Sequence, residues 1–69
     1  MQRSDEMLSQ NLKRIRLEQR YTRKQLAKVA NTTATTIQSI ETEQNDNPRL
    51  KTVMGLAKAL KVSVNTLIK

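Results

Sequence analysis

Four threonines surround a single alanine in the segment TTATTIQSIE, residues 32 to 41. Ile37 and Ile40 stand three residues apart, so on a helix both would face inward. The side chains then left toward solvent are those of Ala34, Thr35, Gln38 and Ser39. An amide can pair with adenine, hydroxyls can bond to several base edges, and methyl groups can contact thymine. The pattern favours a helix that reads base edges in a major groove, although Gln38 alone would be an ordinary exposed residue.

Catalytic chemistry is not indicated by the other residue types. The chain has no histidine and no cysteine, so imidazole and thiolate ligands, nucleophiles and bases are not available. The six acidic residues are scattered and form no evident pair: Asp5, Glu6, Glu18, Glu41, Glu43 and Asp46. We therefore expect no enzyme, no metal site and no cofactor.

The charge balance points to a polyanionic partner. Lys and Arg number 13 against 6 Asp and Glu, which gives a net charge of +7 on 69 residues. Nucleic acid is the first candidate, and the alternative is that the basic surface only keeps a small protein soluble. The length fits one domain, residues 1–69, and no apolar run approaches a membrane span. Together with the absence of cysteine, this predicts a soluble cytoplasmic protein.

Helical periodicity predicts an all-α fold of five short helices. Ser4 is a candidate N-cap for the first helix, whose apolar stripe is Leu8, Leu12 and Ile15. Thr22 and Gln25 form a capping box ahead of a second helix over residues 23–30, which Asn31 ends.

The second half of the chain continues the same pattern. Thr33 can cap a third helix that runs to about Glu41. We predict that the fourth helix begins at Pro48, with Asn47 as a possible cap, and that its stripe is Leu50, Val53, Met54, Ala57 and Leu60. Val62, Ser63 and Leu67 are typical of a hydrophobic staple, an N-cap and its partner, opening a short fifth helix.

Residues 23 to 42 have the spacing of a helix-turn-helix unit. Two helices of about two turns are joined by three or four residues. Ala27 is small, and Ile37 follows ten residues later, as expected where the second helix crosses close to the first.

Three segments in order give the chain a resemblance to a known family. They are LKRIRLEQRYTRKQLAKVA, TIQSIE and NPRLKTVMGLAKALKVSVNTLI. With them, residues 12 to 68 resemble the DNA-binding domain of the Cro/repressor helix-turn-helix family, also called XRE-type. The resemblance implies a compact, lambda-repressor-like bundle of five helices. Similar proteins usually begin the second helix with Gln, where this chain has Arg23.

The resemblance also implies roles for individual residues. Base-reading positions would be Thr33, Ala34, Thr35, Gln38 and Ser39. Phosphate-contacting positions would be Thr22, Arg23, Thr36, Asn45, Asn47 and Arg49. Thr33 and Thr36 can equally serve as a helix cap and a phosphate donor. Arg16 and Glu41 would form a partly buried ion pair between the first helix and the end of the third. A weak two-fold dimer would use Val64, Leu67 and Ile68, or these residues only close the core.

The expected function is that of a sequence-specific regulator of double-stranded DNA, most simply a repressor. Two copies would place their third helices in successive major grooves, ~34 Å apart, on a pseudo-palindromic operator. The alternative is a protein-interaction module, such as an antitoxin or adaptor, with secondary DNA binding. Activation in place of repression stays open, and so does whether the chain is complete or part of a longer regulator.

Overall fold

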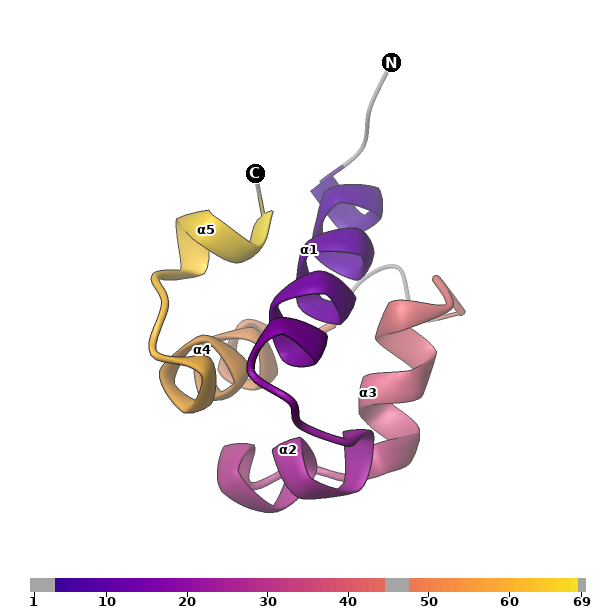
Figure 1. The fold of residues 1–69 in the computed structure, drawn as a ribbon. Helices are drawn as coiled ribbons and strands as arrows, with labels where there is room; N and C mark the ends of the chain where they lie inside the picture. Colours follow the sequence, from indigo (N-terminus) through magenta and orange to yellow (C-terminus); the bar gives the residue numbers. More distant parts are fainter. Residues whose placement is uncertain (1–3, 45–47, 69) are drawn as a thin grey trace.

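The computed structural model describes residues 4–44 and 48–68, and within them the regular structure is helical throughout. The helices are α1 (Ser4–Glu18), α2 (Arg23–Ala30), α3 (Ala34–Glu41), α4 (Leu50–Leu60) and α5 (Val64–Ile68). In Figure 1, α1 runs through the middle, α2 crosses below it, α3 lies on one side, and α4 and α5 lie on the other. The predicted all-α class with five helices is confirmed.

Every helix contributes at least one fully buried side chain to a shared core. The largest of these side chains are Leu12, Leu26, Ile37, Ile40, Leu56, Leu60 and Leu67. Replacing such a residue by alanine typically costs 2–5 kcal/mol, roughly the whole stability of a domain this small. The core therefore holds all five helices together, and the short α2 and α3 depend on it for their helical state.

The ends of α2 and α3 follow the predicted capping chemistry. The Thr22 side chain accepts a hydrogen bond from the Gln25 N–H at 3.0 Å, and the Thr22 N–H donates to Gln25 Oε1 at 2.9 Å. Thr33 caps α3 by accepting from the Thr36 N–H at 3.1 Å. Asn31 ends α2 in the left-handed conformation with φ 59°, as predicted.

The predicted start of α4 is wrong. The helix begins at Leu50, and its N-cap is Arg49, whose backbone is extended with ψ 145° and whose side chain makes no cap bond. A proline fixes only its own φ and restricts the residue before it, so Pro48 does not oblige Arg49 to be helical. Asn47, the expected cap, lies outside the described residues. Ser4, the candidate N-cap of the first helix, is instead the first residue of α1.

Two side-chain amides that the sequence did not suggest, one in α1 and one just after it, bind the C-terminal ends of α5 and α4. Asn11 Nδ2 donates to the Leu67 carbonyl oxygen at 2.8 Å, and Gln19 Nε2 donates to the Leu60 carbonyl oxygen at 2.7 Å. Carbonyl groups at helix ends lack intrahelical partners, so these amides satisfy groups that would otherwise lose hydrogen bonds on burial. At the other end of α5, the predicted cap Ser63 accepts from the Thr66 N–H at 3.2 Å.

None of the helices in the described ranges is long and apolar enough to cross a membrane.

The helices α1 to α4 are each followed by a left-handed residue that carries a side chain. These residues are Arg20, Asn31, Glu43 and Lys61, with φ of 62°, 59°, 64° and 60°. Lys61 is exposed, and the bond from the Val62 N–H to the Ala57 carbonyl oxygen, 2.9 Å long, closes its turn. A residue with a Cβ is strained in this conformation, whereas glycine is not.

Lys61→Gly is therefore expected to stabilise the protein by about 1 kcal/mol, because it removes that strain. The matched control is Lys58→Gly, three residues earlier within α4, where the backbone is helical. There glycine is expected to destabilise by about 1 kcal/mol. Thermal unfolding followed by circular dichroism measures both. A loss of stability in Lys61→Gly would contradict the assignment of this C-cap.

Candidate nucleic-acid interface

The unit formed by α2, its following turn and α3 has the predicted geometry. Each helix has 8 residues, and the turn between them is residues 31–33. The Asn31 N–H and the Thr32 N–H both point back to the Ala27 carbonyl oxygen. Ala27 and Ile37 are buried where the helices meet. The small side chain of Ala27 lets α3 cross α2 closely, which fixes the angle at which α3 leaves the turn.

The outward face of α3 carries the side chains predicted to read base edges. Thr33, Thr35 and Gln38 are exposed, whereas Ala34 and Ser39 are half-buried. The five positions come from one helix and its cap. Because Ile37 and Ile40 hold the opposite face in the core, the polar face of α3 is presented to solvent as a unit.

Thr33 and Thr36 are engaged with each other. Their hydroxyl oxygens lie 2.9 Å apart, and Thr33 Oγ1 also accepts the cap bond from the Thr36 N–H. The hydroxyl of Thr33 thus has a structural task at the start of α3, in line with the cap alternative. Thr36 is half-buried beside it.

The N-terminal ends of α2 and α3 are suited to an anion. Neither helix has an acidic residue in its first turn, so the positive end of each helix dipole is not neutralised locally. Thr22, at the start of α2, is exposed, and so is Arg49, ahead of α4. The two other predicted phosphate contacts in that loop, Asn45 and Asn47, lie outside the described residues.

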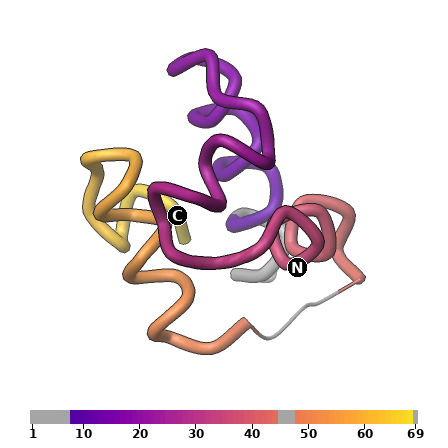
Figure 2. Tube along the Cα trace, turned by 90° about the horizontal axis from the view of Figure 1, so that it is seen from below, coloured from indigo at the N-terminus to yellow at the C-terminus, as the bar shows by residue number. Residues whose placement is uncertain are grey.

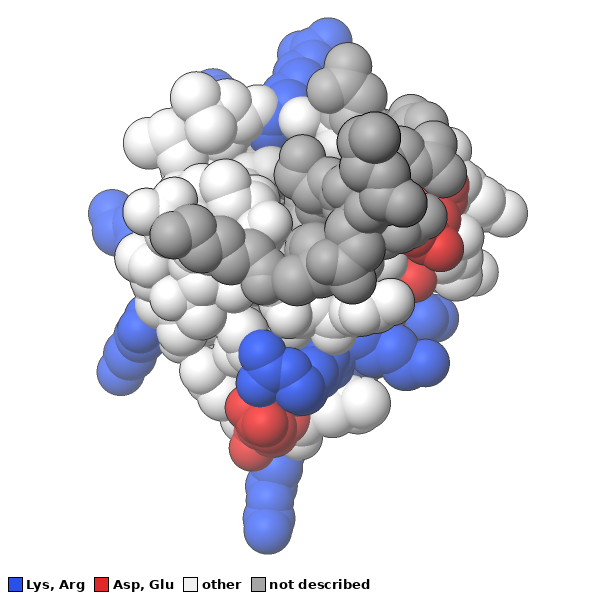
Figure 3. All heavy atoms as spheres, turned by 90° about the horizontal axis from the view of Figure 1, so that it is seen from above, with Lys and Arg blue, Asp and Glu red and all other residues white. Residues whose placement is uncertain are grey.

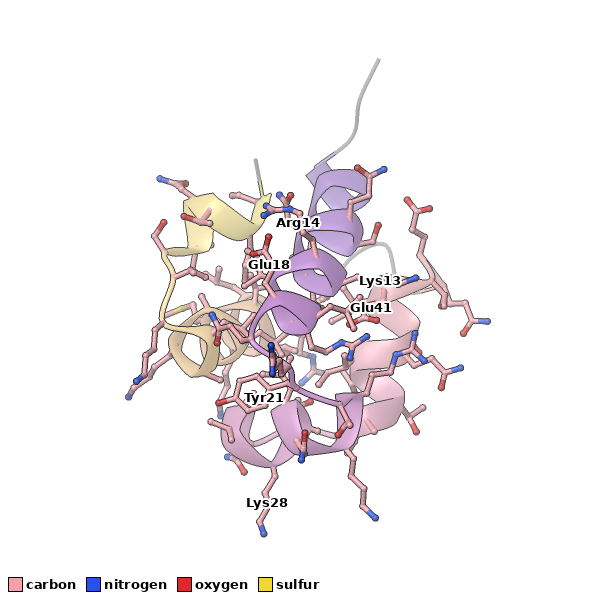
Figure 4. The ribbon with its side chains drawn as sticks, in the orientation of Figure 1. Lys13, Arg14, Glu18, Tyr21, Lys28 and Glu41 are labelled. Atoms are coloured by element: carbon pink, nitrogen blue, oxygen red, sulfur yellow. The ribbon has the colours of Figure 1, made fainter. Side chains whose placement is uncertain are left out.

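A buried carboxylate at the end of α3 joins three helices. Arg16 of α1 donates to both oxygens of Glu41, from Nε to Oε2 at 2.6 Å and from Nη2 to Oε1 at 3.1 Å. Arg16 Nη1 also donates to the Tyr21 carbonyl oxygen at 2.8 Å. Glu41 lies between α1 and α3 with its side chain 0% exposed (Figure 4). The ion pair implied by the family resemblance is thus present, and it is bidentate.

Arg23 is the site residue whose environment differs most from the expectation. It was predicted to contact phosphate, but its Nε donates to Glu41 Oε1 at 3.1 Å, and its side chain is 36% exposed. One carboxylate therefore holds two guanidinium groups. The sequence gave a weak indication of this contact. Arg23 stands where similar proteins usually have Gln, and a carboxylate can accept hydrogen bonds from more than one arginine. Any contact of Arg23 with phosphate has to be made by its terminal nitrogens.

The predicted dimer contact is wrong for Leu67. Its side chain is 0% exposed and belongs to the core of its own chain, so it cannot touch a second copy. The helix α5 packs against α1 and directs Leu67 inward, while Val64 and Ile68 are half-buried. The large apolar side chains that the described residues do expose are Leu17, Val29, Leu50 and Met54.

The basic side chains are spread around the molecule. Seen from above, Lys and Arg project in several directions around the rim, and acidic groups are visible at two places (Figure 3). Lys28 extends away from the body at the foot of α2 (Figure 4). In this view charge alone does not single out one surface, so the geometry of α3 has to identify the site.

The fold and the α2–turn–α3 unit define a small helix-turn-helix protein. A family model described as Helix-turn-helix matches residues 12–67. The chain belongs to this family, the Cro/repressor or XRE type, whose members are DNA-binding regulators. No curated protein matches the chain. No solved structure matches it either.

Glu41→Gln is expected to destabilise the protein by about 3 kcal/mol or more, because it leaves the buried Arg16 without its counter-charge. The matched control is Glu18→Gln. Glu18 forms an exposed pair with Arg14 at 3.4 Å, whose loss is expected to change stability by less than about 1 kcal/mol. Urea unfolding of both variants measures the difference. Equal small losses would mean that the buried network does not hold α3 in place.

Proposed function

We propose that this chain is a sequence-specific regulator that inserts α3 into the major groove of double-stranded DNA and represses transcription by occupying its operator. The observation that carries the proposal is the polar face of α3. Its exposed Thr35 and Gln38, with the half-buried Ala34 and Ser39, offer an amide, hydroxyls and methyl groups without a bulky side chain among them. These are the groups that distinguish base pairs by their major-groove edges.

Phosphate contacts would set the register of α3 on the duplex. The Thr22 hydroxyl and the N-terminal N–H groups of α2 form one contact, since that helix end has no local acidic residue. Arg49 supplies a second, from the start of α4. Such contacts add affinity that is independent of sequence and falls with salt. Sequence preference then has to come from α3.

Repression by occupancy suits two copies on a pseudo-palindromic site, one per half-site. Since Leu67 is not accessible, the contact between copies needs other apolar groups. Leu50 and Met54 are four residues apart on α4, hence on one face, and both are more than half exposed. We propose that this pair, with the half-buried Val64 and Ile68, forms a weak dimer contact. A pair of this size gives little affinity alone, so the dimer would form mainly on DNA.

Selection of binding sites from a random duplex pool tests the function. An inverted repeat is expected to be enriched, bound far more tightly than random duplex at the same salt concentration. Gln38→Ala is expected to lose about 1–3 kcal/mol of discrimination at one base pair of each half-site and to keep the others. Gln10→Ala, which removes an exposed amide from α1, is the control and should retain the full preference. Salt-sensitive binding without any enriched sequence would contradict the proposal.

The double variant Leu50→Glu, Met54→Glu is expected to abolish cooperative binding of the second copy, because it places like charges at the contact. Binding of the first copy to a half-site duplex should be unchanged. Leu17→Glu is the control, since Leu17 is equally exposed but lies on α1. Sedimentation velocity with the selected duplex gives the stoichiometry. Two copies bound to DNA with unchanged cooperativity in the double variant would exclude this contact.

A further inference from the structure

A groove runs between α2 and α4, and it is separate from the face of α3. Its volume is about 620 Å³, and it is bordered by the last residues of α2, the turn that follows, and one face of α4. Figure 2, seen from below, shows the end of α2 and its turn passing beside α4. The proposed base-reading residues do not line this groove.

The floor of the groove is made of small apolar groups. Gly55 and Ala59 of α4 face Val29 and Ala30 of α2. A Cβ at Gly55 would lie 3.1 Å from the Ala30 carbonyl oxygen, a tight contact, so the two helices approach closely there. No long side chain fills the floor, and Val29 is 56% exposed beside it. Ala59 belongs to the core and Ala30 packs against it, so the apolar surface that the groove offers comes mainly from Val29 and the half-buried Gly55.

The rim of the groove is basic. Lys51, Lys58 and Lys61 line it, all three are exposed, and no acidic residue lines it. Lys51 and Lys58 are seven residues apart on α4, with Gly55 between them, so they flank the floor along one helix face. A ligand that fits both features carries apolar groups on one side and negative charge beside them.

We infer that this groove is a docking site for an acidic amphipathic helix of a partner protein. Apolar side chains at helical spacing would lie on the floor formed by Gly55 and Ala59, and carboxylates on the flanks would meet the lysines. Single-stranded nucleic acid fits less well, because it is held by aromatic stacking, and the groove has only the half-buried Tyr21. The inference does not depend on DNA reading by α3.

The test uses a short synthetic peptide with leucines at helical spacing on one face and glutamates on the other. Binding to the ¹⁵N-labelled chain is followed by ¹H–¹⁵N correlation spectra. The amide signals of Ala30, Gly55 and Ala59 are expected to shift, and a scrambled peptide of the same composition should bind about tenfold more weakly. Replacing every glutamate of the peptide by lysine is expected to abolish the shifts at these residues.

Two variants with matched controls connect the binding to the groove. Val29→Glu is expected to weaken binding about tenfold, equivalent to about 1.4 kcal/mol, whereas Leu17→Glu makes the same change at an equally exposed residue outside it. Lys58→Glu should weaken binding similarly, and Lys13→Glu on α1 should not. The spectra themselves report whether each variant is folded.

Three results would overturn the inference. One is equal binding of the scrambled peptide, and another is unchanged binding by Val29→Glu. The third is an oligothymidylate that shifts the same amides at lower concentration than the peptide, which would make the groove a nucleic-acid site.

Discussion

The carboxylate of Glu41 is the point on which the placement of α3 depends. Burying a charge is unfavourable unless opposite charges and hydrogen bonds replace the lost water. Here two guanidinium groups meet one carboxylate, from Arg16 at 2.6 Å and 3.1 Å and from Arg23 at 3.1 Å. Within the described residues no buried side-chain nitrogen or oxygen is left without a partner. Such a network is satisfied in one arrangement of α1, α2 and α3, so it selects an orientation more than it adds stability.

This geometry matters because the helices are too short to be stable by themselves. Helices α2 and α3 have 8 residues each, and isolated helices of that length are largely unfolded in water. Their form comes from Leu26, Ile37 and Ile40 in the common core and from the caps at Thr22 and Thr33. The outward face of α3 is therefore rigid only as far as the core and the Glu41 network are intact. In this chain the residues that would read DNA and those that hold the fold occupy opposite faces of one helix.

Local signals made most of the fold predictable. The capping box of Thr22, the left-handed Asn31 and the burial of Ile37 and Ile40 follow from residue types and helical spacing, and all are found. The pair of Arg16 and Glu41 came from the family resemblance, since 25 residues separate its members. Contacts set by tertiary packing were missed: Arg23 at Glu41, and the amides of Asn11 and Gln19 at the ends of α5 and α4. For Leu67 the sequence left a dimer contact and core closure both open, because a short terminal helix gives too few turns to define its buried face; the structure shows core closure.

The central claim is that α3 lies in the major groove with its polar face against base edges. Its most direct test is an NMR measurement on the chain bound to its selected duplex, with ¹³C-labelled alanine and threonine methyl groups. Intermolecular nuclear Overhauser effects are predicted between the methyl groups of Ala34 and Thr35 and protons on the major-groove edge, such as thymine methyls and cytosine H5. Contacts only to sugar or minor-groove protons, or contacts arising from α5 in place of α3, would contradict it.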